Sequence, residues 1–152
     1  MKAQARANSR PVLLSLLAVM LAALTSCSAE QAPPRTTFGN PADEQPVSVS
    51  LRLNADGIPV EVNAPVPDPV VLSKGSKHTA HWYLCPPVDA KLEIEMKDGT
   101  GPFRNRPRSY GKHVLSDPPE LGDAGKDYRY TILVTTKDGK QLRLDPVIRV
   151  AP

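Results

Sequence analysis

Four basic side chains lie in a stretch that has no acidic residue between Asp98 and Asp117. They are Arg104, Arg106, Arg108 and Lys112, and Phe103, Tyr110 and His113 lie beside them. If the segment is extended, alternation places the three arginines on one side. A planar guanidinium group can bind phosphate or carboxylate through two parallel hydrogen bonds. The segment therefore predicts a site for an anionic partner. The alternative is a solvated loop whose charges are balanced by acids elsewhere.

Histidine, cysteine and methionine are the ligand types of a copper site. The candidates are His78, His81, His113, Cys85 and Met96. His78 and His81 are three positions apart, so they point to opposite faces of a strand. His81 and Cys85 share a face, but they lie about 13 Å apart at about 3.3 Å per residue. This spacing predicts no metal site, and no other motif predicts a cofactor.

Catalytic residues in a familiar arrangement are also missing from the sequence. It has no Gly-x-Ser-x-Gly elbow, and nothing aligns Cys85 with a histidine base. Glu93 and Glu95 lie about 6.6 Å apart on one strand face, a separation that could suit a glycosidase. Lys91 and Lys97 flank them, which favours a solvated charged face. We therefore expect no enzymatic activity, and a tethered enzyme is the less favoured alternative.

Residues 1–26 have the three parts of an export signal. A positive start contains Lys2, Arg6 and Arg10. An apolar run follows from Val12 to Leu24, and it is shorter than the roughly 20 residues that span a bilayer. The run ends in Leu24-Thr25-Ser26-Cys27, which resembles the lipobox of bacterial lipoprotein precursors.

This resemblance implies cleavage before Cys27, a diacylglycerol on its sulfur and an acyl chain on its new amino group. Each buried methylene adds about 0.8 kcal/mol, so two or three chains would anchor the protein in a membrane. In enterobacterial lipoproteins an aspartate after the acceptor favours the inner membrane, so Ser28 implies the outer membrane, facing the periplasm. The alternative is an ordinary secretory signal, with Cys27 as a thiol or in a disulfide. Acylation of Cys27 would leave Cys85 as the only thiol of the mature chain, and we expect that thiol to be buried and inert.

The formal charge of +3 belongs to the predicted signal, because its three basic residues have no acidic counterpart there. The mature chain is neutral, so its composition predicts no nucleic-acid partner. Residues 27–46 are predicted to form a flexible linker, since they contain four prolines and Phe38 is their only large apolar residue.

Apolar and polar residues alternate from Val47 onward, which is typical of strands. The expected strands cover 47–53, 58–62, 70–73, 76–84, 91–97, 113–115, 128–134 and 142–150, and residues 101–112 are expected to form a long loop or a ragged sheet edge. Asn54-Ala55-Asp56-Gly57 and Lys137-Asp138-Gly139-Lys140 are typical turns, and Trp82 is the expected core anchor. Residues 47–152 are thus predicted to form an all-β domain, a small antiparallel β-sandwich of about seven or eight strands around a single core.

The segment from Tyr128 to Ile148 resembles the final hairpin of small immunoglobulin-like or cupredoxin-like sandwiches in bacterial envelope proteins. This resemblance implies a fold class and no activity. We therefore expect a membrane-anchored lipoprotein whose domain binds or assembles with an envelope protein or an anionic polymer, through sheet edges or the basic segment. The alternative is a small-ligand or metal carrier of the cupredoxin type. In that family a histidine and then a methionine closely follow the cysteine, whereas Pro86 and Pro87 follow Cys85.

Overall fold

The computed structural model describes residues 43–152 except 76, 86 and 87. The predicted signal, Cys27 and linker residues up to 42 lie outside the described residues. Eleven strands and no α-helix form in the described part: β1 Glu44–Val49, β2 Leu51–Leu53, β3 Pro59–Val62, β4 Val70–Ser73, β5 Thr79–Leu84, β6 Ala90–Met96, β7 Arg108–Tyr110, β8 His113–Leu115, β9 Asp127–Thr136, β10 Gln141–Leu144 and β11 Val147–Ala151. None of these residues belongs to a helix that could cross a membrane.

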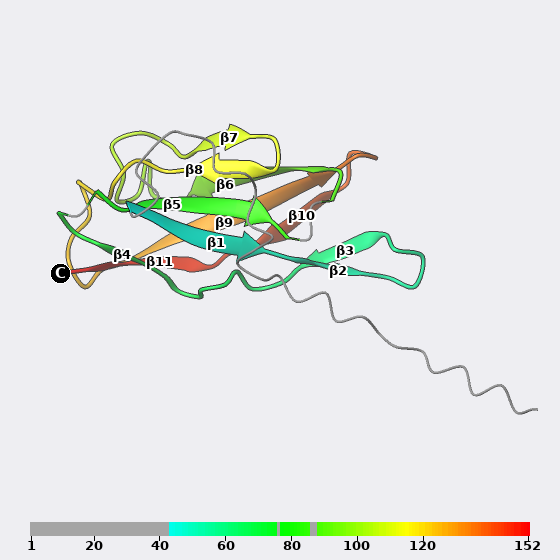
Figure 1. The fold of residues 1–152 in the computed structure, drawn as a ribbon, viewed down its shortest axis with the longest axis horizontal. Helices are drawn as coiled ribbons and strands as arrows, with labels where there is room; N and C mark the ends of the chain where they lie inside the picture. Colours follow the sequence, from blue (N-terminus) through cyan, green and yellow to red (C-terminus); the bar gives the residue numbers. More distant parts are fainter. Residues whose placement is uncertain (1–42, 76, 86–87) are drawn as a thin grey trace, which may run out of the picture.

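Two large sheets and one hairpin make up the domain (Figure 1). The first, which we call the β5 sheet, has the order β1-β5-β8-β7. In the second, the β9 sheet, β6 pairs with β9, which also pairs with β10 and β11, and β11 pairs with β4. The β1·β5 and β4·β11 pairs are parallel, so the prediction of a purely antiparallel sheet was wrong for these two pairs. The prediction of seven or eight strands was also too low.

Two of the additional strands arise where predicted strands change partner, and the third, β7, forms within residues 101–112, outside the predicted strands. The predicted strand 47–53 divides at Ser50, because β1 pairs with β5 and β2 pairs with β3. The predicted strand 142–150 divides at Asp145, whose carboxylate accepts a hydrogen bond from Thr131 Oγ1 at 2.7 Å and pairs with Lys97 Nζ at 3.2 Å. β1 also begins at Glu44, within the predicted linker, because its parallel pairing with β5 starts there.

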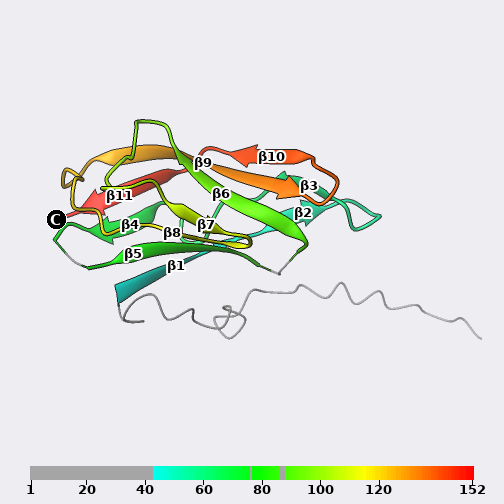
Figure 2. The same cartoon turned by 90° about the horizontal axis from the view of Figure 1, so that it is seen from above.

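The turn after β2 forms as its sequence predicts. Asn54 Oδ1 accepts hydrogen bonds from the main-chain nitrogens of Asp56 and Ile58, at 3.0 and 2.8 Å. Gly57 adopts a φ of +75°, which favours glycine over residues with a side chain. The resulting β2–β3 hairpin extends beyond the two sheets (Figure 2).

One hydrophobic core lies between the β5 sheet and the β9 sheet (Figure 2). Trp82 from β5 and Tyr130 from β9 are its largest fully buried side chains, as expected for Trp82. Their rings lie 5.7 Å apart, and Trp82 Nε1 donates a hydrogen bond to the Tyr130 hydroxyl at 3.3 Å. This contact joins the two sheets through their centre, and burial raises the pKa of Tyr130 well above its ordinary value.

Replacing Tyr130 with Phe should destabilise the protein, because it removes the acceptor of a buried indole N–H. A buried donor without a partner costs about 1–3 kcal/mol. Urea unfolding followed by tryptophan fluorescence measures this loss. Leu53→Ala, on the exposed face of the hairpin, is the control and should change the free energy of unfolding by less than about 0.5 kcal/mol. Equal stability of Tyr130→Phe and the unsubstituted protein would show that the hydrogen bond contributes nothing.

Candidate functional site

The basic segment between β6 and β8 is anchored at two points. Phe103 is fully buried in the core, so its ring is not available to a ligand of the basic residues. Asn105 donates from its main-chain nitrogen and its side chain to Asp117 Oδ2, at 3.1 and 2.7 Å. A Cβ on Gly101 would collide with the side chain of Met96, and Gly101 has a φ of +63°. The path of the segment is therefore fixed around its arginines.

Arg104 is neutralised within the domain. Its guanidinium forms an ion pair with Glu120 at 2.9 Å, and both side chains are more than half exposed. An exposed pair of this kind contributes only about 0–1 kcal/mol to stability. Because Glu120 already occupies its guanidinium, Arg104 is less suited than an unpaired arginine to bind an anionic ligand.

Arg106 lines a cleft between the basic segment and β6. The cleft has a volume of about 420 Å³ and is formed by Glu93, Ile94, Glu95, Met96, Arg106, Pro107 and Ser109. Leu92 closes one end, since its main-chain nitrogen donates to Gly111 O at 2.7 Å and its carbonyl accepts from Ser109 Oγ at 2.5 Å. Arg106 is exposed and forms no ion pair with another described residue. Its guanidinium therefore keeps its hydrogen-bonding capacity for a ligand.

Arg108 lies on β7, all of whose residues are exposed. It forms no ion pair within the described part of the chain, and its strand partner is Leu115. Lys112 is partly exposed in the turn between β7 and β8, and its carbonyl accepts from Leu84 N at 3.2 Å. The extended conformation that would place the three arginines on one side is not formed, because only residues 108–110 of the segment form a strand. The four basic residues have four different environments.

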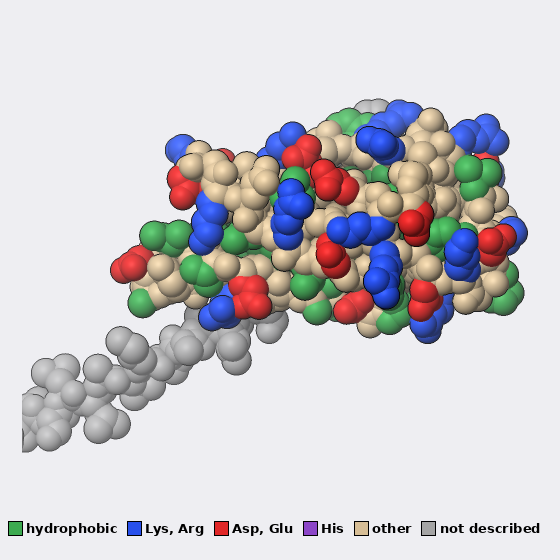
Figure 3. Space-filling model, turned by 180° about the vertical axis from the view of Figure 1, so that it is seen from behind, with side chains coloured by type: hydrophobic (Ala, Val, Ile, Leu, Met, Phe, Trp, Pro, Cys, Tyr) green, Lys and Arg blue, Asp and Glu red, His purple; other side chains and the backbone are tan. Residues whose placement is uncertain are grey.

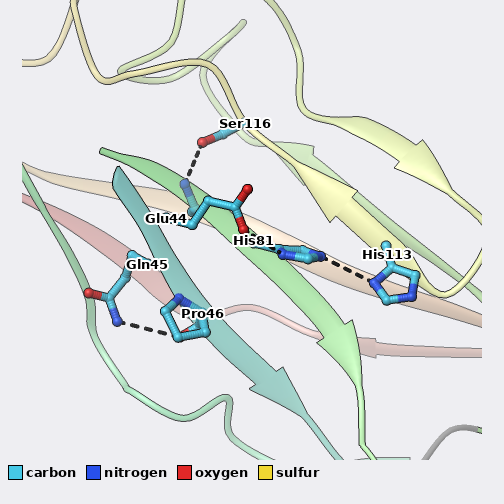
Figure 4. Close-up of polar contacts among 7 residues, drawn as sticks. Glu44, Gln45, Pro46, His81, His113 and Ser116 are labelled. Carbon is cyan, nitrogen blue, oxygen red and sulfur yellow. Dashed lines mark hydrogen bonds and ion pairs between the residues drawn. The ribbon is translucent and has the colours of Figure 1, made fainter. Parts of the chain in front are cut away.

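Three neighbouring strands carry a chain of hydrogen-bonded ionisable groups that the sequence did not predict (Figure 4). His81 Nδ1 on β5 lies 3.3 Å from Glu44 Oε2 on β1, and His81 Nε2 lies 3.2 Å from His113 Nδ1 on β8. His81 is buried, with 8% of its surface exposed. The only signal in the sequence was a histidine in each of two predicted strands. Their contact depends on β5 and β8 being neighbours.

The chain of groups can hold one extra proton without losing a hydrogen bond. With both rings neutral, His113 donates to His81, and His81 donates to ionised Glu44. If His81 becomes protonated, both of its nitrogens donate, to Glu44 and to His113. If both His81 and His113 were protonated, His81 Nε2 and His113 Nδ1 would both be donors and would face each other without an acceptor. Burial, with a smaller repulsion from His81 and then Lys112, lowers the pKa of His113.

The remaining metal-ligand candidates do not gather around these histidines. Within the described residues, no group of three or more His, Cys, Asp or Glu side chains is placed to bind a metal ion. Cys85 is 1% exposed, as expected, but it is disulfide-bonded. The expectation that Cys85 is a thiol applies to a chain with acylated Cys27 and stays a prediction. The other cysteine of the sequence, Cys27, lies outside the described residues.

The outer face of the β9 sheet is a charged surface with many ion pairs (Figure 3). Lys and Arg side chains alternate there with Asp and Glu, and Lys91 pairs with Glu93 at 2.8 Å. Arg149 donates from two nitrogens to Asp127 at 2.7 and 2.9 Å, which lowers the pKa of this carboxyl. Glu95 is exposed. These pairs favour the solvated-face interpretation of Glu93 and Glu95 over a pair of catalytic carboxylates.

No known protein family matches the sequence, and no curated protein is significantly similar to it.

The lowered pKa of His113 predicts that the protein loses stability in mild acid. The unfolded chain binds a proton near pH 6.5, whereas folded His113 binds it only at a lower pH. Stability from this group is therefore present above pH 6.5 and declines as the pH falls from 6.5 through the folded pKa. Urea unfolding between pH 8 and 5 measures this slope, and His113→Gln should flatten it.

His78→Gln is the matched control for this measurement and should keep the slope. A slope that is unchanged in His113→Gln would contradict the assignment of the acid sensitivity to His113.

Proposed function

We propose that this chain is a non-catalytic, membrane-anchored lipoprotein of the bacterial envelope whose β domain is a binding or assembly module. The supporting observation is that Arg106 and Arg108 are exposed, form no ion pair with a described residue, and flank strand edges that border a cleft. Arginine suits carboxylate and phosphate groups. The proposed partner is an envelope protein or an anionic polymer, and no nucleic acid is involved.

The proposed fold is an immunoglobulin-like or cupredoxin-like β-sandwich, of which the immunoglobulin-like form is the better supported. Two sheets that share one core support this assignment. Further support comes from Tyr128 at the start of β9, whose hydroxyl accepts a hydrogen bond from the main-chain nitrogen of Asp123 at 2.9 Å. A tyrosine bonded to the main chain a few residues upstream is typical of such sandwiches. The two parallel strand pairs distinguish this domain from a simple antiparallel sandwich.

The proposed tether consists of lipidated Cys27 and a linker that ends where β1 begins, at Glu44. The lipobox-like residues 24–27 support it, and Ser28 supports an outer-membrane location facing the periplasm. One sulfur atom cannot carry a thioether lipid and form a disulfide. Since the chain has two cysteines, the proposal requires that Cys85 in the lipidated protein is either reduced or joined to another molecule.

Lipidation can be tested by fractionating cells and weighing the mature protein. We expect the protein in the membrane fraction, with a mass that corresponds to cleavage before Cys27 plus diacylglycerol and an acyl chain. Cys27→Ala should move the domain to the soluble fraction or leave an uncleaved precursor. Cys85→Ala is the control and should stay lipidated. Membrane association of Cys27→Ala with a cleaved signal would contradict the proposal.

The binding function can be tested by cross-linking in cells, followed by recovery of the lipoprotein and identification of the bound proteins and polymers. The Arg106→Glu, Arg108→Glu double variant should lose at least about nine-tenths of one enriched partner, because it reverses both exposed charges. Arg104→Glu is the matched control, since Arg104 is already paired with Glu120. Equal recovery by all variants, or no enriched partner, would contradict the proposed binding module.

A further inference from the structure

We infer that the cleft between β6 and residues 106–109 binds an extended peptide that carries an acidic group, and this inference rests on the proposed binding function. The occupant would be a segment of an envelope protein that adds its main chain to a strand edge. Strand addition obtains affinity from main-chain hydrogen bonds and specificity from side-chain contacts.

The main chain of Ile94 faces the cleft. Among the described residues β6 pairs only with β9, so no described strand pairs with its other edge. Residues of an antiparallel strand direct their N–H and C=O groups alternately toward and away from the partner strand. Lys97 N donates to Arg129 O, toward β9, whereas Leu92 N donates to Gly111 O, away from it. By this alternation Ile94 and Met96, like Leu92, direct their main-chain groups away from β9.

The main chain of Ser109 faces the cleft from the opposite side. Ser116 N donates to Ala80 O, and Leu84 N donates to Lys112 O. Val114 of β8, which lies between Lys112 and Ser116, therefore also directs its main-chain groups to β5. Ser109 lies opposite Val114, so this pair is not hydrogen-bonded, and Ser109 directs its main-chain groups away from β8. The edges of two different sheets thus border one cleft.

The width of the cleft changes along β6. At Leu92 the two edges are joined through Gly111 and Ser109. Beyond Leu92 no strand pairing joins β6 to β7, and the cavity of about 420 Å³ begins. This volume lies within the range of about 300–1,000 Å³ found for ligand pockets. Only a short extended segment would fit, and it would enter from the open end.

The charges at the cleft give the peptide a preferred composition. Arg106 has no anionic partner among the described residues, so it can receive a carboxylate from the peptide. Glu93 is already paired with Lys91 at 2.8 Å. Glu95 is exposed and would repel a second acidic residue near it. The fitting peptide therefore carries its acidic group on the Arg106 side and a neutral or basic residue beside Glu95.

The test uses the full-length lipidated protein in detergent micelles and an array of pentapeptides in which Thr and Val alternate. One Asp is moved through each position, and a matched array carries Lys in its place. At least one Asp peptide should bind, and Arg106→Gln should raise its Kd at least about tenfold. Arg104→Gln is the matched control and should change the Kd less than about twofold. Bound peptide should slow amide hydrogen exchange in residues 94–96.

Three results would overturn the inference: no Asp peptide binds, Arg106→Gln binds as tightly as the unsubstituted protein, or binding leaves exchange at residues 94–96 unchanged. Complete displacement of the peptide by inorganic phosphate at millimolar concentration would also overturn it, because it would indicate a simple anion site. The cellular cross-linking experiment separates the two proposals. If the peptide experiment fails but a cellular partner is lost in the Arg106→Glu, Arg108→Glu variant, the proposed binding module is still supported and only the peptide site is rejected.

Discussion

The contact between Trp82 and Tyr130 is the interaction on which the domain depends most. Each residue comes from the central region of a different sheet, and both are fully buried. Their rings fill the core, and the indole N–H is satisfied by the phenol oxygen. In the described part of the chain no buried side-chain nitrogen or oxygen lacks a hydrogen-bond partner. Large aromatic rings can therefore supply apolar area to the core of a small domain without leaving their polar atoms unsatisfied.

The two sheets end in edge strands beside one cleft. The β5 sheet and the β9 sheet approach each other at Leu92 and separate beyond it. β6 and β7 are consequently edge strands that face one cleft, while the outer face of the β9 sheet is covered by ion pairs. Exposed edges are places where another chain can pair. The position of Arg106 beside these edges connects the charge of the segment with main-chain groups that only the fold assembles.

The outer side of the β5 sheet has a different chemistry. Glu44, His81 and His113 form a continuous hydrogen-bonded chain across β1, β5 and β8. β1 directly follows the proposed tether, so this chain of groups joins the first strand of the domain to the middle of the sheet. Burial, with a smaller repulsion from His81 and Lys112, lowers the pKa of His113 in this chain of groups. The protonation of His113 is thereby coupled to the packing of β8 against β5.

The sequence by itself determined that the domain is all-β. The strands predicted over 70–73, 91–97, 113–115 and 128–134 correspond to β4, β6, β8 and most of β9, and the turns at 54–57 and 137–140 formed where predicted. These features are local, because side-chain alternation and turn conformation depend on neighbouring residues. Only the tertiary structure decided the strand order and the two parallel pairs. It also decided the Glu44–His81–His113 chain and the separation of Arg104 from Arg106. They depend on contacts between residues far apart in the chain, and a strand pattern does not specify which other strand will be its neighbour.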